Sequence, residues 1–111
     1  MLTVYTASMN YKGSKESLDV TVKSGEEVFA PTWEMVMKTK QGKMSWEEYK
    51  AQYYEMMRKS YEDNFERWQE ILAREELVLL CYCKSPGRCH RRLLAEMLEE
   101  AGANYKGEIK G

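Results

Sequence analysis

Residues 77–100 read LVLLCYCKSPGRCHRRLLAEMLEE, and this stretch decides the fold. It opens with four consecutive aliphatic residues, which is typical of a strand buried on both faces of a parallel sheet covered by helices. Leucines and a methionine at helical spacing then predict a helix over residues 90–101, with Gly102 ending it. The three cysteines and the only histidine of the chain stand where these two elements meet.

The flanking sequence adds further elements of both kinds. Alternating or β-branched residues predict strands, and apolar residues at helical spacing predict helices. The residues of Ser45-Trp46-Glu47-Glu48 form a capping box that starts a long helix, with a bend expected near Ser60. The expected strands cover 2–7, 17–22, 77–83 and 105–109, and the expected helices cover 31–40, 46–72 and 90–101. This order predicts a single α/β domain over residues 1–111, with a small, mostly parallel sheet of about four strands and covering helices.

Composition narrows the class of protein. The chain has 111 residues, is 43% hydrophobic and carries a formal net charge of −1, so we expect no extended nucleic acid as a partner. No apolar run approaches the ~18 residues of a membrane span, and no signal peptide is visible. We expect a soluble, cytoplasmic protein with reduced thiols and no membrane partner. The sequence leaves the oligomeric state open, a homo-oligomer included.

Four cations surround the turn before the last helix. No acidic residue stands between Glu76 and Glu96, whereas Lys84, Arg88, Arg91 and Arg92 fall within nine positions. Arginines in the first helical turn oppose the helix dipole unless something negative is bound or packed there. The pattern favours an anion held by Arg91 and the free helix amides. The alternative is that Arg91 and Arg92 pair with Glu96, Glu99 or Glu100, or point to solvent.

The cysteines and the histidine allow three interpretations. A thiolate of Cys89 or Cys83 among arginines could be a nucleophile, with His90 as acid or base, or the cysteines could be small core residues. Zinc on Cys81, Cys83, Cys89 and His90 is disfavoured by the spacing, because we expect the adjacent Cys89 and His90 to diverge. We therefore expect neither a metal nor a cofactor.

The remaining patterns are less specific. The chain lacks the phosphatase loop, because six positions after Cys83 stands Cys89 instead of arginine, and it lacks the Rossmann and Walker patterns. An aromatic series could stack on a base, although helical spacing favours a place in the core. Its members are Trp33, Trp46, Tyr49, Tyr53, Tyr54, Tyr61 and Trp68.

The segment LLCYCKSPGRCHRRLLAEMLEEAGA resembles the C-terminal signature of the family known as domain of unknown function 488. VYTAS, LDVTV and APTW resemble earlier parts of its compact form. The resemblance implies a small α/β domain with a pocket lined by the end of the first strand, the aspartate of the second and the Cys-His-Arg turn. In this chain these residues are Tyr5, Thr6, Asp19, Cys83, Cys89, His90 and Arg91. One departure is Lys84, where many members have an acidic residue.

We therefore expect a binding domain for a phosphorylated or otherwise anionic small molecule, most simply a nucleotide or a nucleotide-derived metabolite. Arg91 would hold phosphate, and Thr6, Ser8 and Asp19 would orient a sugar or base. Trp33, Tyr53 and Arg58 would reach the ligand from the helices. Compact members of this family look like proteins encoded by phages and by archaeal or bacterial genomes. The resemblance therefore also admits a viral or accessory protein that sequesters the ligand.

Two alternatives remain open at this point. The first is an enzyme that uses Cys89, Cys83 or His90 on a glycosidic, phosphoryl or acyl bond of a nucleotide-like substrate. The second is a structural interaction module whose basic turn is covered by a partner chain.

Overall fold

The chain folds into a four-stranded sheet and four helices in a computed structural model, which describes residues 1–83 and 88–109. All strand pairs are parallel, in the order β2-β3-β1-β4. Along the chain the elements are β1 (Thr3–Ser8), β2 (Ser17–Asp19), α1 (Trp33–Lys40), α2 (Trp46–Asp63), α3 (Phe65–Leu72), β3 (Glu76–Cys81), α4 (His90–Glu100) and β4 (Asn104–Glu108). The expected small α/β fold is confirmed.

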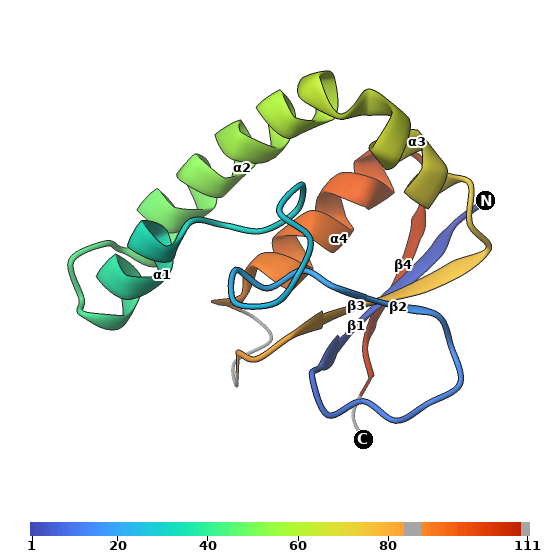
Figure 1. Ribbon diagram of the computed structural model, residues 1–111, viewed down its shortest axis with the longest axis horizontal. Helices are drawn as coiled ribbons and strands as arrows, with labels where there is room; N and C mark the ends of the chain where they lie inside the picture. The colour runs from blue at the N-terminus through green and yellow to red at the C-terminus, as the bar shows by residue number, and fades with distance from the viewer. Residues whose placement is uncertain (84–87, 110–111) are drawn as a thin grey trace.

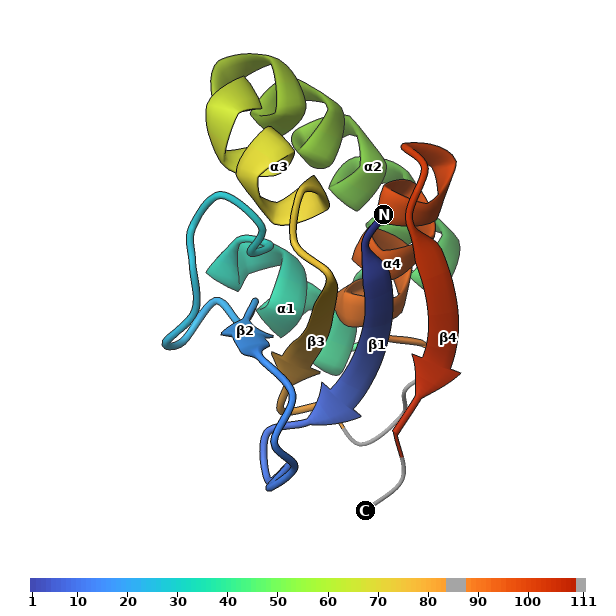
Figure 2. The same ribbon diagram turned by 90° about the vertical axis from the view of Figure 1, so that its right-hand side faces the viewer.

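The described helices gather on one face of the sheet (Figures 1 and 2). Helix α4 packs directly on β1, β3 and β4, and α2 packs against α4. On the opposite face, Val78 and Leu80 are covered by side chains from β1 and from the segments that follow β1 and β4, including Met9 and Ile109. The aliphatic strand is therefore buried on both faces as expected, but the second face is covered by loop residues instead of helices.

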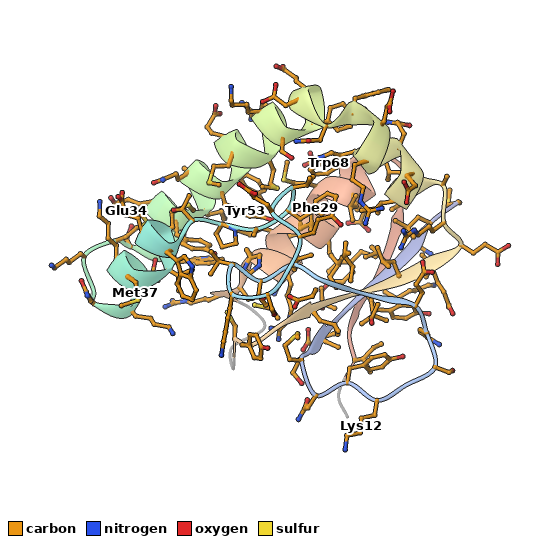
Figure 3. The ribbon with its side chains drawn as sticks, in the orientation of Figure 1. Lys12, Phe29, Glu34, Met37, Tyr53 and Trp68 are labelled. Carbon is orange, nitrogen blue, oxygen red and sulfur yellow. The ribbon has the colours of Figure 1, made fainter. Side chains whose placement is uncertain are left out.

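Three members of the aromatic series, Tyr49, Tyr53 and Trp68, are buried in the core beneath the helices, and Phe29 lies there with them. Phe29, Tyr53 and Trp68 point into the space between the helices and the sheet (Figure 3), and each is at most 2% exposed. The Tyr53 hydroxyl donates to the Phe29 carbonyl at 2.8 Å, and the Trp68 indole N–H donates to Ser60 Oγ at 3.2 Å. Their polar atoms thus have partners inside the protein, as buried aromatic residues require.

Helix starts follow the sequence closely. Ser45 and Glu48 form the expected capping box, with the Glu48 amide donating to Ser45 Oγ at 3.1 Å. The first helix begins at Trp33 instead of Pro31, because the Thr32 hydroxyl accepts the Met35 amide at 3.1 Å and so occupies the cap position. The long helix breaks at Asn64, whose backbone is not helical (φ −128°, ψ 39°), instead of bending near Ser60.

Two strands end earlier than expected, at Asp19 instead of Val22 and at Cys81 instead of Cys83. The Asp19 carboxylate accepts from the Thr21 amide at 2.9 Å, from the Thr21 hydroxyl at 2.7 Å and from the Ser24 hydroxyl at 2.5 Å. Asp19 and Thr21 do contact each other, but in a turn that takes the chain out of the sheet. Within the described residues, no helix has both the length and the apolar character that a membrane crossing demands.

The turn at Asp19 makes stability depend on pH. Burial opposes ionisation, but the hydrogen bonds from Ser24 and Thr21 hold the pKa of Asp19 below its ordinary value of 3.8. A carboxyl with a lowered folded pKa stabilises the fold above its unfolded pKa, and this contribution is lost as pH falls through the folded pKa. Asp19→Asn keeps one acceptor oxygen and removes the charge, so it should lower the free energy of unfolding by about 1 kcal/mol at pH 7.

Urea unfolding followed by circular dichroism, from pH 7 down to pH 3, measures this effect. The difference between Asp19→Asn and the unmodified chain should shrink toward the acid end. Glu27→Gln, in an exposed position of the same loop, serves as the control with little change. A difference that stays constant over the whole pH range would contradict the assignment.

Candidate functional site

A pocket of about 530 Å³ lies at the carboxyl ends of β2 and β3. Ligands of open α/β sheets usually bind at this edge, and the volume suits a small molecule. The walls come from the segment after β2, from α1, from the start of α2, from the end of β3 and from the start of α4. The lining residues are Thr21, Val22, Lys23, Pro31, Trp33, Val36, Thr39, Lys40, Trp46, Tyr49, Cys81, Tyr82, Cys83, Arg88 and His90.

Cations and aromatic rings line this pocket together. Lys23, Lys40 and Arg88 supply positive charge, and none of the lining residues that the structure describes is acidic. Within the described residues, none of the three cations forms a salt bridge, although Lys23 Nζ lies 5.6 Å from the centre of the Tyr82 ring. The arrangement can neutralise an anion and stack on a flat ring.

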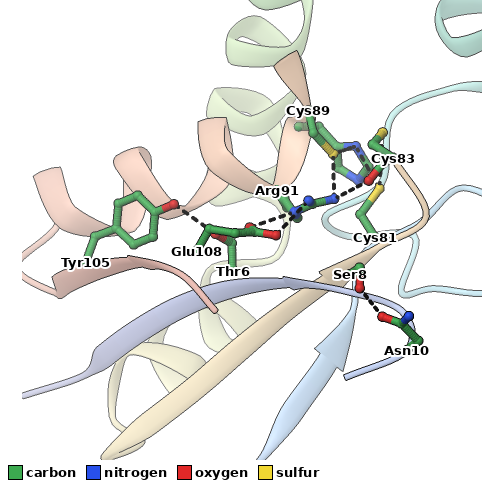
Figure 4. A network of polar contacts seen from close by, with 10 residues as sticks. Thr6, Ser8, Asn10, Cys81, Cys83, Cys89, Arg91, Tyr105 and Glu108 are labelled. Carbon is green, nitrogen blue, oxygen red and sulfur yellow. Dashed lines mark hydrogen bonds and ion pairs between the residues drawn. The ribbon is translucent and has the colours of Figure 1, made fainter. Parts of the chain in front are cut away.

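Three thiols and one imidazole converge beside the pocket. Cys81 Sγ lies 3.5 Å from Cys83 Sγ and 3.9 Å from His90 Nδ1, and Cys89 Sγ also lies 3.9 Å from His90 Nδ1. All three sulfurs lie within 4.8 Å of one another (Figure 4). We call Cys81, Cys83, Cys89 and His90 the thiol–imidazole cluster. The expectation that Cys89 and His90 diverge is wrong, because the extended backbone of Cys89 (φ −138°, ψ 145°) precedes the helix and turns its side chain back toward His90.

His90 is held in one orientation by the main chain. Its side chain is buried, at 3% exposure, and its Nε2 lies 2.6 Å from the Val20 carbonyl oxygen. A carbonyl can only accept, so Nε2 carries the proton and the Nδ1 lone pair of the neutral ring faces the sulfurs. The ring of Tyr53 packs against the imidazole, with the two ring centres 5.6 Å apart.

The thiols titrate as a group because each affects the others. Hydrogen bonds from Cys83 and Cys89 lower the pKa of Cys81. Hydrogen bonding to Cys81 and Cys83, together with burial, raises the pKa of Cys89. Negative charge in the cluster is therefore favoured first at Cys81, the strand cysteine.

Arg91 has an internal partner, Glu108, which lies 17 positions further along the chain. Its side chain is 1% exposed, and it donates to both carboxylate oxygens of Glu108, at 3.1 and 2.9 Å. Its Nη1 also donates to the Cys83 carbonyl at 3.1 Å and to Cys89 Sγ at 3.6 Å (Figure 4). Burial opposes its charge, but the Glu108 hydrogen bonds keep the pKa of Arg91 above its ordinary value.

Arg91 is therefore absent from the pocket lining, and the negative group near the start of α4 is Glu108 of β4. Arg92 follows the simpler expectation, because its Nε lies 3.6 Å from the Glu96 carboxylate one helical turn away.

The other residues expected at a site fall into several places. Trp33, Cys83 and His90 line the pocket. Thr6 is buried and its hydroxyl hydrogen-bonds the Tyr105 hydroxyl at 2.9 Å, while Ser8 hydrogen-bonds Asn10 beside a separate hollow of about 540 Å³.

The remaining four are used elsewhere in the fold. Asp19 holds the turn described above, and Tyr53 lies in the core. Tyr5 packs on the sheet face without helices. Arg58 is exposed on α2 and pairs with Glu55 at 2.7 Å. The structure does not bring these four residues to the pocket.

Several pocket residues were missed from the sequence. Lys23 and Lys40 stand in ordinary polar surroundings, and no local pattern sets them apart. Trp46 and Tyr49 belong to the aromatic series, and Arg88 belongs to the group of four cations. Membership of these two patterns is the only feature of the sequence that could have indicated a place in the pocket. Lys84, the fourth cation of that cluster, lies outside the described residues.

Comparison with known proteins identifies a family for this chain. A family model described as DUF488-N3a, the active DUF488-N3 subclade, matches residues 1–102. No curated protein and no solved structure matches the chain.

Removing the buried guanidinium tests its structural role. Arg91→Met should lower the free energy of unfolding by about 3 kcal/mol, because it leaves Glu108 and the Cys83 carbonyl without their donor. A hydrophobic replacement of both partners, Arg91→Met with Glu108→Leu, should recover most of that loss. Denaturant unfolding measures both changes.

Arg92→Met is the matched control, because Arg92 is 54% exposed in its side chain on the same helical turn. It should change the free energy of unfolding by less than about 0.5 kcal/mol. Equal effects of Arg91→Met and Arg92→Met would show that the ion pair with Glu108 contributes nothing to stability.

Proposed function

The chain belongs to the active DUF488-N3 subclade, and from this premise we propose that it binds a small anionic molecule, a nucleotide or a nucleotide-derived metabolite. The observation that carries the proposal is the lining of one pocket by cations and aromatic rings without an acidic residue among the described lining residues. A nucleotide needs both kinds of group, because its phosphate is negative and its base has a flat apolar face.

The phosphate-binding groups are Lys23, Lys40 and Arg88. They stand on three different segments, after β2, at the end of α1 and before α4. Cations with no carboxylate partner among the described residues keep their full attraction for a ligand, whereas Arg91 is already neutralised by Glu108. We therefore assign anion binding to the pocket cations and a structural role to Arg91.

The base-binding groups are the aromatic residues at the pocket rim. Trp33 and Tyr82 are 52% and 54% exposed, which is unusual for such large side chains. Trp46 stacks on Tyr49, with ring centres 5.4 Å apart, and both rings line the pocket. A base stacked on one of the rim rings gains about 1–3 kcal/mol.

The biological use belongs to the same proposal. A small domain with a nucleotide pocket suits a cytoplasmic protein, viral or accessory, that sequesters a nucleotide.

Calorimetric titration with a panel of nucleoside mono- and diphosphates tests the binding function. Combined replacement of the pocket cations, Lys23→Gln with Lys40→Gln and Arg88→Gln, should weaken binding at least 10-fold, and added salt should weaken binding to the unmodified chain. Lys59→Gln, an exposed cation paired with Asp63 on α2, should leave affinity unchanged. The proposal would be overturned if no nucleotide of the panel bound to the unmodified chain.

Stacking of the base on an aromatic ring is tested with one variant and a matched control. Trp33→Ala should weaken nucleotide binding about 10-fold while leaving binding of inorganic phosphate unchanged, because only the base loses a partner. Phe65→Ala removes a ring that is similarly exposed, at 51%, but lies on α3 away from the pocket. If both variants have the same effect, the base does not stack on Trp33.

A second candidate function is an enzyme acting on the same class of ligand. Two observations favour it: the description of the subclade as active, and the presence of Cys83 and His90 in the pocket lining. There the sulfur of Cys83 would bond to the glycosidic, phosphoryl or acyl centre of the ligand, His90 would pass the proton lost by the thiol to the leaving group, and water would then release the covalent intermediate. Chromatography of the nucleotide panel after incubation separates the two functions, because a binding domain returns each ligand unchanged and the enzyme forms a product that Cys83→Ser abolishes.

A further inference from the structure

The thiol–imidazole cluster has the composition and spacing of a metal centre. We propose that it is a tetrahedral zinc site whose four ligands are the sulfurs of Cys81, Cys83 and Cys89 and Nδ1 of His90. Three thiolates and one imidazole are a common ligand set of structural zinc. The inference is independent of the anion binding assigned to Lys23, Lys40 and Arg88, because it concerns different atoms, and it competes with the catalytic alternative for Cys83 and His90.

The separations around Cys81, and between Cys89 and His90, are close to those of such a centre, whereas Cys83 Sγ and His90 Nδ1 would have to approach each other. Zinc bonds of about 2.3 Å to sulfur and 2.0–2.1 Å to nitrogen in a tetrahedron place two sulfurs about 3.8 Å apart and a sulfur about 3.6 Å from nitrogen. The observed separations are 3.5 Å between Cys81 and Cys83, and 3.9 Å from His90 Nδ1 to the sulfurs of Cys81 and Cys89. The three sulfurs all lie within 4.8 Å of one another.

The imidazole is already oriented as a ligand. Its Nε2–H donates to the Val20 carbonyl at 2.6 Å, which leaves the Nδ1 lone pair facing the sulfurs. Metal-bound histidines almost always use their second nitrogen in this way.

Charge and access also suit a cation. Zinc with three thiolates and one neutral imidazole carries one negative charge, and Arg91 Nη1 donates to Cys89 Sγ at 3.6 Å beside it. Cys81, Cys83 and His90 line the pocket, so the ion has a path from solvent. With four protein ligands the centre is closed and structural, joining the end of β3 to the start of α4.

The unmodified chain provides the decisive test. After reduction and chelator treatment, it should take up one zinc ion per chain in competition with a coloured chelator, and zinc should raise its Tm. Cobalt(II) in place of zinc should give the visible absorption of a tetrahedral ion and a sulfur-to-cobalt charge-transfer band. Zinc should also protect all three thiols from alkylation.

Single variants then identify the ligands. Cys81→Ser, Cys83→Ser, Cys89→Ser and His90→Ala should each weaken zinc binding at least about 100-fold, since each removes a direct ligand. The cysteine variants should also reduce the charge-transfer band, whereas His90→Ala should retain its sulfur contribution. Arg92→Gln, on the first turn of α4 but outside the cluster, should keep full stoichiometry.

Either of two results would overturn the proposal. One is a reduced, folded and unmodified chain that takes up no zinc at micromolar concentration or gives the spectrum of six-coordinate cobalt. The other is zinc binding of unchanged affinity in each of the four single ligand variants. The first result is read on the unmodified chain, so a variant that fails to fold does not obscure the answer.

Discussion

The side chain of Arg91 leaves the first turn of α4 and is 1% exposed, with its charge matched by the carboxylate of Glu108 at the end of β4. A guanidinium buried this far is tolerated only if its donors find acceptors. The acceptors are Glu108, the Cys83 carbonyl and Cys89 Sγ, which belong to three different segments of the chain. One side chain therefore ties the last strand, the segment after β3 and the start of α4 together. The positions of the thiols and of one pocket wall depend on this connection.

The carboxyl edge of the sheet consequently has two electrostatic environments. The inner one contains Arg91 and Glu108, whose charges compensate each other inside the protein. The outer one contains Lys23, Lys40 and Arg88 around aromatic rings, with no acidic side chain among the described lining residues. A ligand anion gains little from a guanidinium that already has a carboxylate partner, and much more from cations in a partly enclosed pocket. This contrast is why the proposed binding function is assigned to the outer cations.

The thiol–imidazole cluster lies between these two environments. Cys81, Cys83 and His90 face the pocket, while Cys89 is buried beside Arg91. A zinc ion in the cluster would hold the pocket wall rigid without itself binding the ligand, because its four coordination positions would be filled by protein. The catalytic alternative requires a free thiolate at the same position, so zinc binding and thiol catalysis are competing uses of Cys83.

Local physical chemistry determined the elements of this protein. The aliphatic run at Leu77–Leu80 predicts a buried parallel strand, and the capping box at Ser45 predicts the start of α2, because both patterns act between residues close in sequence. The core position of Trp68 also follows from helical spacing, whereas Tyr53, which we expected at the ligand, lies in the core. The sequence likewise identified the cysteine, histidine and arginine turn as chemically important.

Only the tertiary structure decided how those residues are used. The pairing of Arg91 with Glu108, the convergence of Cys89 and His90 on Cys81, and the gathering of Lys23 and Lys40 around one pocket depend on how separate segments cross the sheet. No local pattern encodes such contacts, since their energy is gained only after the chain has packed.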